Sequence, residues 1–184
     1  MSTIHIVGLS GSLRRDSYNT ALLRAAQSVL PDDAKLEIIE YADVPVYNHD
    51  VEKHDGYPES VVSMREKLGR ADAILFAAPE YNWSIPGVMK NAIDWASRGS
   101  DSPLDDKPAA IMGAGGRLGT AYAQQHLRQI LMHNDMRVVT RPNVLISHAS
   151  KQFDEELNLV NERHLDQIKR LLVALVEETE RARQ

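Results

Sequence analysis

The sequence of 184 residues contains no cysteine, and only 5% of its residues are aromatic. The lack of cysteine excludes a disulfide scaffold, thiolate zinc sites, cysteine-ligated iron–sulfur clusters and a cysteine nucleophile. With 10 glycines and 8 prolines, the chain is not a low-complexity or collagen-like sequence. Because no apolar run approaches the roughly 20 residues of a membrane span, we expect no membrane partner.

The chain also lacks an excess of positive charge. It carries 21 Lys and Arg against 26 Asp and Glu, which gives a net charge of −5. A general nucleic-acid binder would show a basic surplus, so we expect no nucleic-acid partner. The amino-terminal residues have neither the charged region nor the apolar region of a signal peptide, and we expect a cytoplasmic location.

Short apolar runs typical of strands alternate with longer helical patterns, and the length suits one domain over residues 1–184. Strands are predicted at 3–9, 35–41, 73–78 and 108–114, with a fifth strand or its continuation at 136–139 and 143–146; helices are predicted at 18–29, 59–70, 87–97, 120–133 and 157–183. Five βα units in this order indicate an α/β fold with helices on both faces of a parallel sheet. We expect a flavodoxin-like three-layer sandwich with a five-stranded sheet of order 2-1-3-4-5.

In this strand order, a ligand crevice lies outside the carboxyl ends of the first and third strands. The loops that start at Ser10 and at Pro79 should therefore converge there. They are also the two most unusual stretches of the chain, so the fold and the motifs point to the same place.

The loop after the first predicted strand, GLSGSLRRDSYN, has the composition of an anion site. Ser10, Ser12, Ser17 and Asn19 are compact donors, Arg14 and Arg15 add charge, and Gly11 permits close approach of the backbone. The loop leads into a helix whose free N–H groups and positive dipole end favour an anion. The alternative is an ordinary polar turn in which Ser17 is only an N-cap. We favour the anion site for the whole loop and leave Ser17 alone open.

The loop after the third predicted strand, PEYNWSIPG, suits a flat ligand. Its two prolines stiffen the backbone, and Tyr81 and Trp83 are aromatic side chains at an exposed position. Asn82 and Ser84 offer polar groups to the edge of a heteroaromatic ring. The alternative is a turn whose aromatic residues pack into a helix or a partner subunit, and for Trp83 alone we favour that alternative.

A third loop, GAGGRLG, follows the fourth predicted strand. Its glycines resemble a variant dinucleotide fingerprint, and Asp135 follows Gly115 by 20 residues, but it precedes the next strand instead of ending it. We interpret the loop as a close backbone approach to the same flat ligand. A glycine-rich connector is the alternative.

The remaining polar residues carry weaker signals. His126 and His133 share a helix face without the i, i+4 spacing of metal ligands, and we expect no metal site. Residues 49–55 are interpreted as a solvated polar loop. Arg98 and Arg117 would flank an anionic ligand or would be plain surface charge. No side chain is assigned as a catalytic acid or base.

Together, the segments Gly11–Asn19 and Pro79–Trp95 and the glycine-rich third loop resemble the NADPH-dependent FMN reductase family. Within that family the chain is most similar to the bacterial soluble quinone and chromate reductases. The resemblance implies a flavodoxin-like fold, bound FMN, NADPH or NADH as co-substrate, and a homodimer or homotetramer.

The resemblance also implies cofactor-binding residues. In the first two loops these are Ser12, Leu13, Arg14, Ser17, Tyr18 and Asn19, and Pro79, Glu80, Tyr81, Asn82 and Ser84. The phosphate would be held by Ser12, Arg14, Ser17 and Asn19, and the isoalloxazine edge would be lined by residues 79–82, with Ser84 nearby. In the third loop relatives tend to carry Thr or Ser before the glycines, so only backbone contacts of Ala114 and Gly115 carry over.

The implied activity is hydride transfer from the nicotinamide to FMN, followed by reduction of a small-molecule acceptor. Quinones, chromate, azo compounds, nitro compounds and free flavin are all candidate acceptors, and ping-pong kinetics is expected. The alternative is a flavodoxin-like electron carrier or ligand-binding module without turnover of its own. A carrier would be strongly acidic, so the mild charge of −5 and the arginines of the first loop favour the enzyme.

Overall fold

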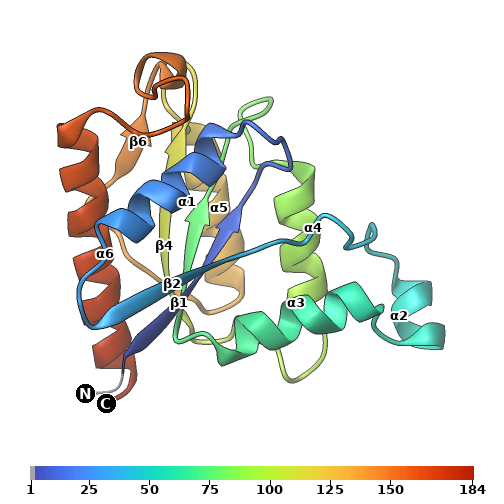
Figure 1. Cartoon of the computed structure of the whole chain (residues 1–184). Coiled ribbons are helices and arrows are strands. Elements are labelled where there is room, and N and C mark those ends of the chain that lie inside the picture. Colours follow the sequence, from blue (N-terminus) through green and yellow to red (C-terminus); the bar gives the residue numbers. More distant parts are fainter. Residues whose placement is uncertain (1–2) are drawn as a thin grey trace.

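The computed structural model describes residues 3–184, so Met1 and Ser2 of the predicted domain lie outside the described residues. The elements are β1 (Ile4–Ser10), α1 (Tyr18–Ser28), β2 (Ala34–Ile39), α2 (His49–Asp55), α3 (Glu59–Arg70), β3 (Ala73–Ala77), α4 (Gly87–Ala96), β4 (Pro108–Ala114), α5 (Ala121–His133), β5 (Arg137–Val138), β6 (Val144–Ile146), the 3-10 helix η1 (Ala149–Lys151) and α6 (Glu162–Ala182). Figure 1 shows the central sheet between two layers of helices.

The strands form one parallel sheet of order β2-β1-β3-β4-β5, which confirms the predicted fold and strand order. The fifth position is occupied by two short strands instead of one. β5 pairs with Pro108 and Ala109 at the start of β4, and β6 pairs with residues 112–114 at its end. The carboxyl ends of β1, β3 and β4 therefore lie at one edge of the sheet (Figure 1).

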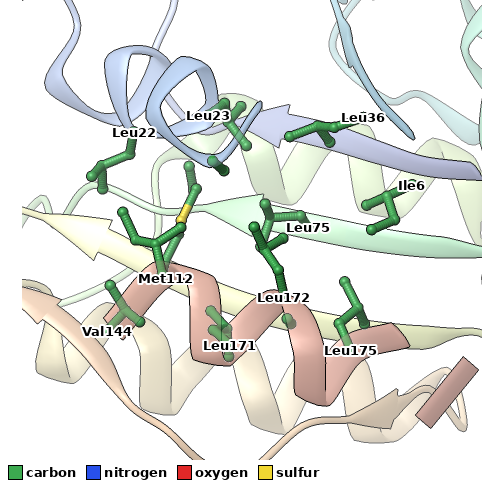
Figure 2. Packing of buried hydrophobic residues seen from close by; sticks show 14 of the residues in the cluster. Ile6, Leu22, Leu23, Leu36, Leu75, Met112, Val144, Leu171, Leu172 and Leu175 are labelled. Atoms are coloured by element: carbon green, nitrogen blue, oxygen red, sulfur yellow. The ribbon is translucent and has the colours of Figure 1, made fainter. Parts of the chain in front are cut away.

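Each face of the sheet has its own hydrophobic core. α1 and α6 cover one face, where Leu172 and Leu175 point toward the strands and Val144 lies beside Met112 (Figure 2). α3, α4 and α5 cover the other face, around Phe76. Because neighbouring residues of a strand point to opposite faces, a strand that is buried on both sides must be apolar throughout, as β3 is.

Two predicted segments differ from the structure. Residues 49–55 form a helix and not a loop: the Asn48 side chain caps it by accepting from the Asp50 N–H at 2.9 Å. No residue of α2 is buried, so no apolar periodicity marks it, and the prediction of a solvated segment is correct. The last helix begins at Glu162 instead of residue 157, because Asn161 caps it and the preceding residues form a turn.

Asp72 joins the two ends of the chain at the amino edge of the sheet. Asp72 accepts from the His5 N–H at 2.8 Å and pairs with Arg183 at 2.8 Å. Burial alone would raise the pKa of Asp72, but the Arg183 guanidinium and the His5 N–H lower it below its ordinary value. Among the described residues, no helix is both long enough and apolar enough to cross a membrane.

Candidate active site

The loops after β1 and β3 meet at the switch point, as predicted. The Gly11 N–H donates to the Ala77 carbonyl at 2.8 Å, which continues the β1–β3 ladder into the loop. A Cβ atom at Gly11 would lie 2.8 Å from Pro79 Cδ and 3.1 Å from Met89 Cε. Glycine is therefore required at this position by contact between the two loops.

The start of α1 presents unsatisfied donors beside the first loop. Ser17 is its N-cap and accepts from the Thr20 N–H at 3.2 Å, so the N-cap interpretation of Ser17 is correct. The capping oxygen still carries a hydroxyl proton that can be donated to an anion, so capping and anion binding are compatible. The N–H groups of Tyr18 and Asn19 precede any intrahelical acceptor, and residues 3–184 provide no other acceptor for them.

Ser12 and Arg14 lie in the loop that leads to this helix start. Arg14 is exposed, and its guanidinium makes one short bond to the Asp16 carbonyl. The Ser12 hydroxyl accepts from the Arg14 N–H at 3.4 Å. Free amides at a helix N-terminus, a hydroxyl and a guanidinium form a set of donors that suits a phosphate. These residues therefore fit the phosphate end of FMN.

Asn19 makes a contact that the sequence did not predict. Its side chain is buried, donates from Nδ2 to the Ala114 carbonyl and accepts at Oδ1 from the Ala114 N–H, both at 3.0 Å. These two bonds connect the start of α1 to the end of β4. The side chain thus joins the first and third loops. Phosphate binding by Asn19 stays a prediction, and the group available for it is the unpaired backbone N–H.

The second loop is a tight hairpin turn. Tyr81 and Ser84 exchange two backbone hydrogen bonds, at 3.0 and 2.9 Å. Asn82 and Trp83 between them have φ of 50° and 61°, as a type I′ turn requires at both central residues. Asn adopts this conformation readily, whereas a bulky aromatic residue does so rarely. The turn leaves the Tyr81 side chain half-exposed and the Trp83 side chain 70% exposed.

Three contacts attach the second loop to α5. The Glu80 carboxylate accepts from the N–H groups of Tyr122 at 2.9 Å and Ala123 at 3.0 Å. Trp83 stacks on Tyr122 with ring centroids 5.4 Å apart. The Ser84 hydroxyl lies 3.0 Å from Nδ1 of His126.

Glu80 thereby caps α5 from a distant part of the chain. Thr120 occupies the N-cap position but makes no side-chain cap bond, and one Glu80 oxygen accepts two of the helix's first N–H groups. A carboxylate also interacts favourably with the positive end of the helix dipole. Glu80 was predicted to line the isoalloxazine edge. Its carboxylate has an additional structural partner, which no local motif around Glu80 indicates.

Gly113 and Gly115 of the third loop are required by the packing of the protein itself. A Cβ at Gly113 would lie 2.1 Å from the Thr120 hydroxyl and 2.4 Å from the Ala78 carbonyl, and one at Gly115 would lie 2.3 Å from the Gly119 carbonyl. The sequence interpretation, close approach to a ligand, is not needed to explain them.

Two amides predicted to contact the cofactor already have acceptors. The Ala114 N–H donates to Asn19, and the Gly115 N–H donates to the Ile146 carbonyl at 2.9 Å. The amides of Arg117 and Leu118, at the exposed tip, have no acceptor within the part of the chain that the structure describes. Those two amides are thus free donors at the tip of this loop, and they were not among the predicted contacts.

Arg98 and Asp135 lie away from this donor set. The Arg98 guanidinium bonds the Asp94 carbonyl and the Ser97 hydroxyl, each at 2.8 Å, and covers the Tyr47 ring. Asp135 follows α5 and precedes β5, at the amino edge of the sheet, so it cannot complete a dinucleotide fingerprint with the third loop. Within residues 3–184, no group of three or more His, Cys, Asp or Glu side chains is arranged to hold a metal.

Comparison with known proteins identifies the family. The model of the family described as NADPH-dependent FMN reductase matches residues 4–151. The chain belongs to this family. Membership confirms the predicted family and the predicted enzyme class, a flavin-dependent oxidoreductase, and the family's use of FMN with NAD(P)H agrees with the cofactor prediction.

Relatives cover nearly the whole chain. The NAD(P)H-dependent FMN reductase of Pseudomonas aeruginosa is 46% identical over 173 residues, which are 94% of this chain and 93% of the relative. The NADPH:quinone oxidoreductase of Arabidopsis thaliana is 41% identical over 94% of this chain and 90% of its own. The solved structure of the flavoenzyme NAD(P)H:(acceptor) oxidoreductase from Paracoccus denitrificans, 30% identical, superposes with a TM-score of 0.88 over 98% of this chain and 99% of that one.

Proposed function

We propose that this member of the family reduces quinones with electrons from NADPH or NADH, through FMN held at the three loops. The observation that supports it best is the donor set at the start of α1 and in the loop that leads to it: two unpaired amides, the Ser12 hydroxyl and the Arg14 guanidinium. FMN, when bound, supplies the hydride and electron transfer chemistry. Relatives named quinone oxidoreductases or quinone reductases, from 34% to 41% identity among those compared, support quinone as the acceptor class.

In this proposal the protein binds and orients the reactants. Ser12, Arg14 and the amides of Tyr18 and Asn19 hold the phosphate, while residues 79–82 line one edge of the ring. The attachment of the second loop to α5 fixes that edge. The free amides of Arg117 and Leu118 are donors for polar ring atoms. No side chain is assigned a proton-transfer role.

The test is the visible absorbance spectrum of the purified protein with added FMN. We expect a flavin spectrum that bleaches with NADPH and recovers with benzoquinone. Chromate, an azo dye, a nitroaromatic compound and free FMN are then compared as acceptors by kcat/KM. A protein that binds no flavin, or one whose reduced flavin is not reoxidised by any quinone, would refute the proposal.

We also propose a homodimer or homotetramer in the cytoplasm. Trp83, Tyr122 and Met132 are 70%, 40% and 69% exposed, and all three lie on α5 or on the loop attached to it. Exposed large apolar residues of this kind are frequent at subunit interfaces. Light scattering measures the assembly, and a particle of 20.6 kDa at all concentrations would contradict it.

A further inference from the structure

A second concave site lies beside the first loop, on the side away from β3. This groove has a volume of about 650 Å³ and runs between α1 and the carboxyl end of β2. Leu13, Arg14 and Arg15 border it from the loop, Arg24 from α1 and Glu40 from the end of β2. The function proposed above uses Ser12 and Arg14 at the border of this groove, but neither Arg15 nor Arg24.

The groove gathers unpaired positive charge on an acidic protein. Three guanidinium groups line it against one carboxylate, although the whole chain carries a net charge of −5. The side chains of Arg15 and Arg24 are exposed, and neither has a hydrogen bond or an ion pair with any residue from 3 to 184. Arg14 commits only one bond, to a carbonyl. Arg15 and Arg24 therefore retain all of their side-chain donors for a ligand, whereas Arg14 is shared with the donor set assigned to FMN.

Such a site fits a phosphate monoester. The group carries close to two negative charges at neutral pH and accepts several hydrogen bonds, and guanidinium groups match its geometry with paired donors. An uncharged or singly charged ligand would leave most of these donors unused. Lining the same groove, the Leu13 side chain is half-exposed and offers apolar surface next to the charges.

We propose that this groove binds the 2′-phosphate of NADPH and thereby selects NADPH over NADH. The two dinucleotides differ only in that phosphate, and residues 12–14 border both the groove and the donor set assigned to FMN. The groove therefore lies next to the flavin phosphate site, and the proposal takes the dinucleotide to extend from the flavin across the loop into it. This assignment rests on the proposed function, because it takes the nicotinamide end of the same molecule to be the reductant.

The experiment uses the protein loaded with FMN, so that the flavin phosphate site is filled. Calorimetry compares adenosine 2′,5′-bisphosphate with 5′-AMP, which lacks the 2′-phosphate. We expect the bisphosphate to bind at least about tenfold more tightly, and Arg24→Gln or Arg15→Gln to weaken it about tenfold, the effect of one charge-assisted hydrogen bond. In steady-state assays, the ratio of KM for NADPH to KM for NADH should rise by a similar factor in both variants.

The matched control is Arg163→Gln, which removes an exposed arginine from the first turn of α6 and should change neither ratio. Equal binding of the two nucleotides, or bisphosphate binding that does not depend on Arg15 or Arg24, would overturn the assignment. Release of FMN by the bisphosphate, seen as a rise in flavin fluorescence, would also overturn it, because the groove and the flavin phosphate site would then be one. A protein that binds the bisphosphate through Arg24 but oxidises neither NADPH nor NADH supports the groove and refutes the proposed function instead.

Discussion

Replacing Glu80 by alanine should destabilise the protein even when no flavin is present. The Glu80 carboxylate makes two hydrogen bonds to the first turn of α5, at 2.9 and 3.0 Å, and Thr120 makes no cap bond that could replace them. Loss of an N-cap costs about 1 kcal/mol, and loss of the charge at the helix dipole costs roughly another 0.3–1 kcal/mol. The expected loss is therefore about 1–2 kcal/mol.

For a domain of this size, each kcal/mol shifts Tm by roughly 2–4 °C, so Glu80→Ala should lower Tm by roughly 2–8 °C. Chemical denaturation of the flavin-free protein measures the free energy of unfolding directly. Glu80→Gln keeps an accepting oxygen but loses the charge, and it should fall between the wild type and Glu80→Ala. Glu155→Ala removes an exposed carboxylate from a loop and serves as the control.

The measurement separates two roles of Glu80. A residue that only lines the isoalloxazine edge would alter FMN affinity and leave the flavin-free protein as stable as the wild type. Replacement of a residue that attaches the second loop to α5 lowers both the FMN affinity and the stability of the flavin-free protein. Unchanged stability of flavin-free Glu80→Ala, within about 0.3 kcal/mol, would refute the capping argument, because the loss expected from the cap alone exceeds that limit.

Three further substitutions test the same structure. Asn19→Ala leaves the buried N–H and carbonyl of Ala114 without partners, and the free energy of unfolding should fall by about 2–3 kcal/mol in denaturant titrations. Gly113→Ala places a Cβ 2.1 Å from a side-chain oxygen and should yield little folded protein by circular dichroism, whereas Gly87→Ala, which meets nothing within 4 Å, should fold normally. The pKa of Asp72 is lowered in the folded state. Its contribution to the free energy of unfolding is therefore present above the unfolded pKa and is lost as the pH falls through the folded pKa. Asp72→Asn should lose less stability than the wild type on acidification below about pH 4.

The sheet was predictable because its signals are local. Central parallel strands buried on both faces must be apolar throughout, and β3 and β4 are, so their ranges and order follow from the sequence. α2 was missed because no face of it is buried, and without burial an amphipathic pattern has no cause. Asn48 was the one available signal, as a residue that commonly caps a helix.

Long-range contacts explain what the sequence did not reveal about the site. Asn19 and Ala114 are 95 positions apart, and Glu80 and Tyr122 are 42 apart, so neither pair forms a local motif. The composition of the loops indicates polar donors but does not say which of those donors the protein itself uses. The structure separates the donors that bond within the protein from those that remain available to a ligand.

The same contacts show how the site can be ordered without a ligand. The first loop is bonded to the end of β3 through Gly11, the start of α1 is joined to the third loop through Asn19, and the second loop is attached to α5 through Glu80. Each loop is thus positioned by protein groups, while the amides of Tyr18, Asn19 and the third-loop tip remain unpaired. A site whose positioning bonds and ligand-binding donors are different groups pays little ordering entropy when FMN arrives. Under the proposed function, the same ordered site serves the nicotinamide first and the acceptor second.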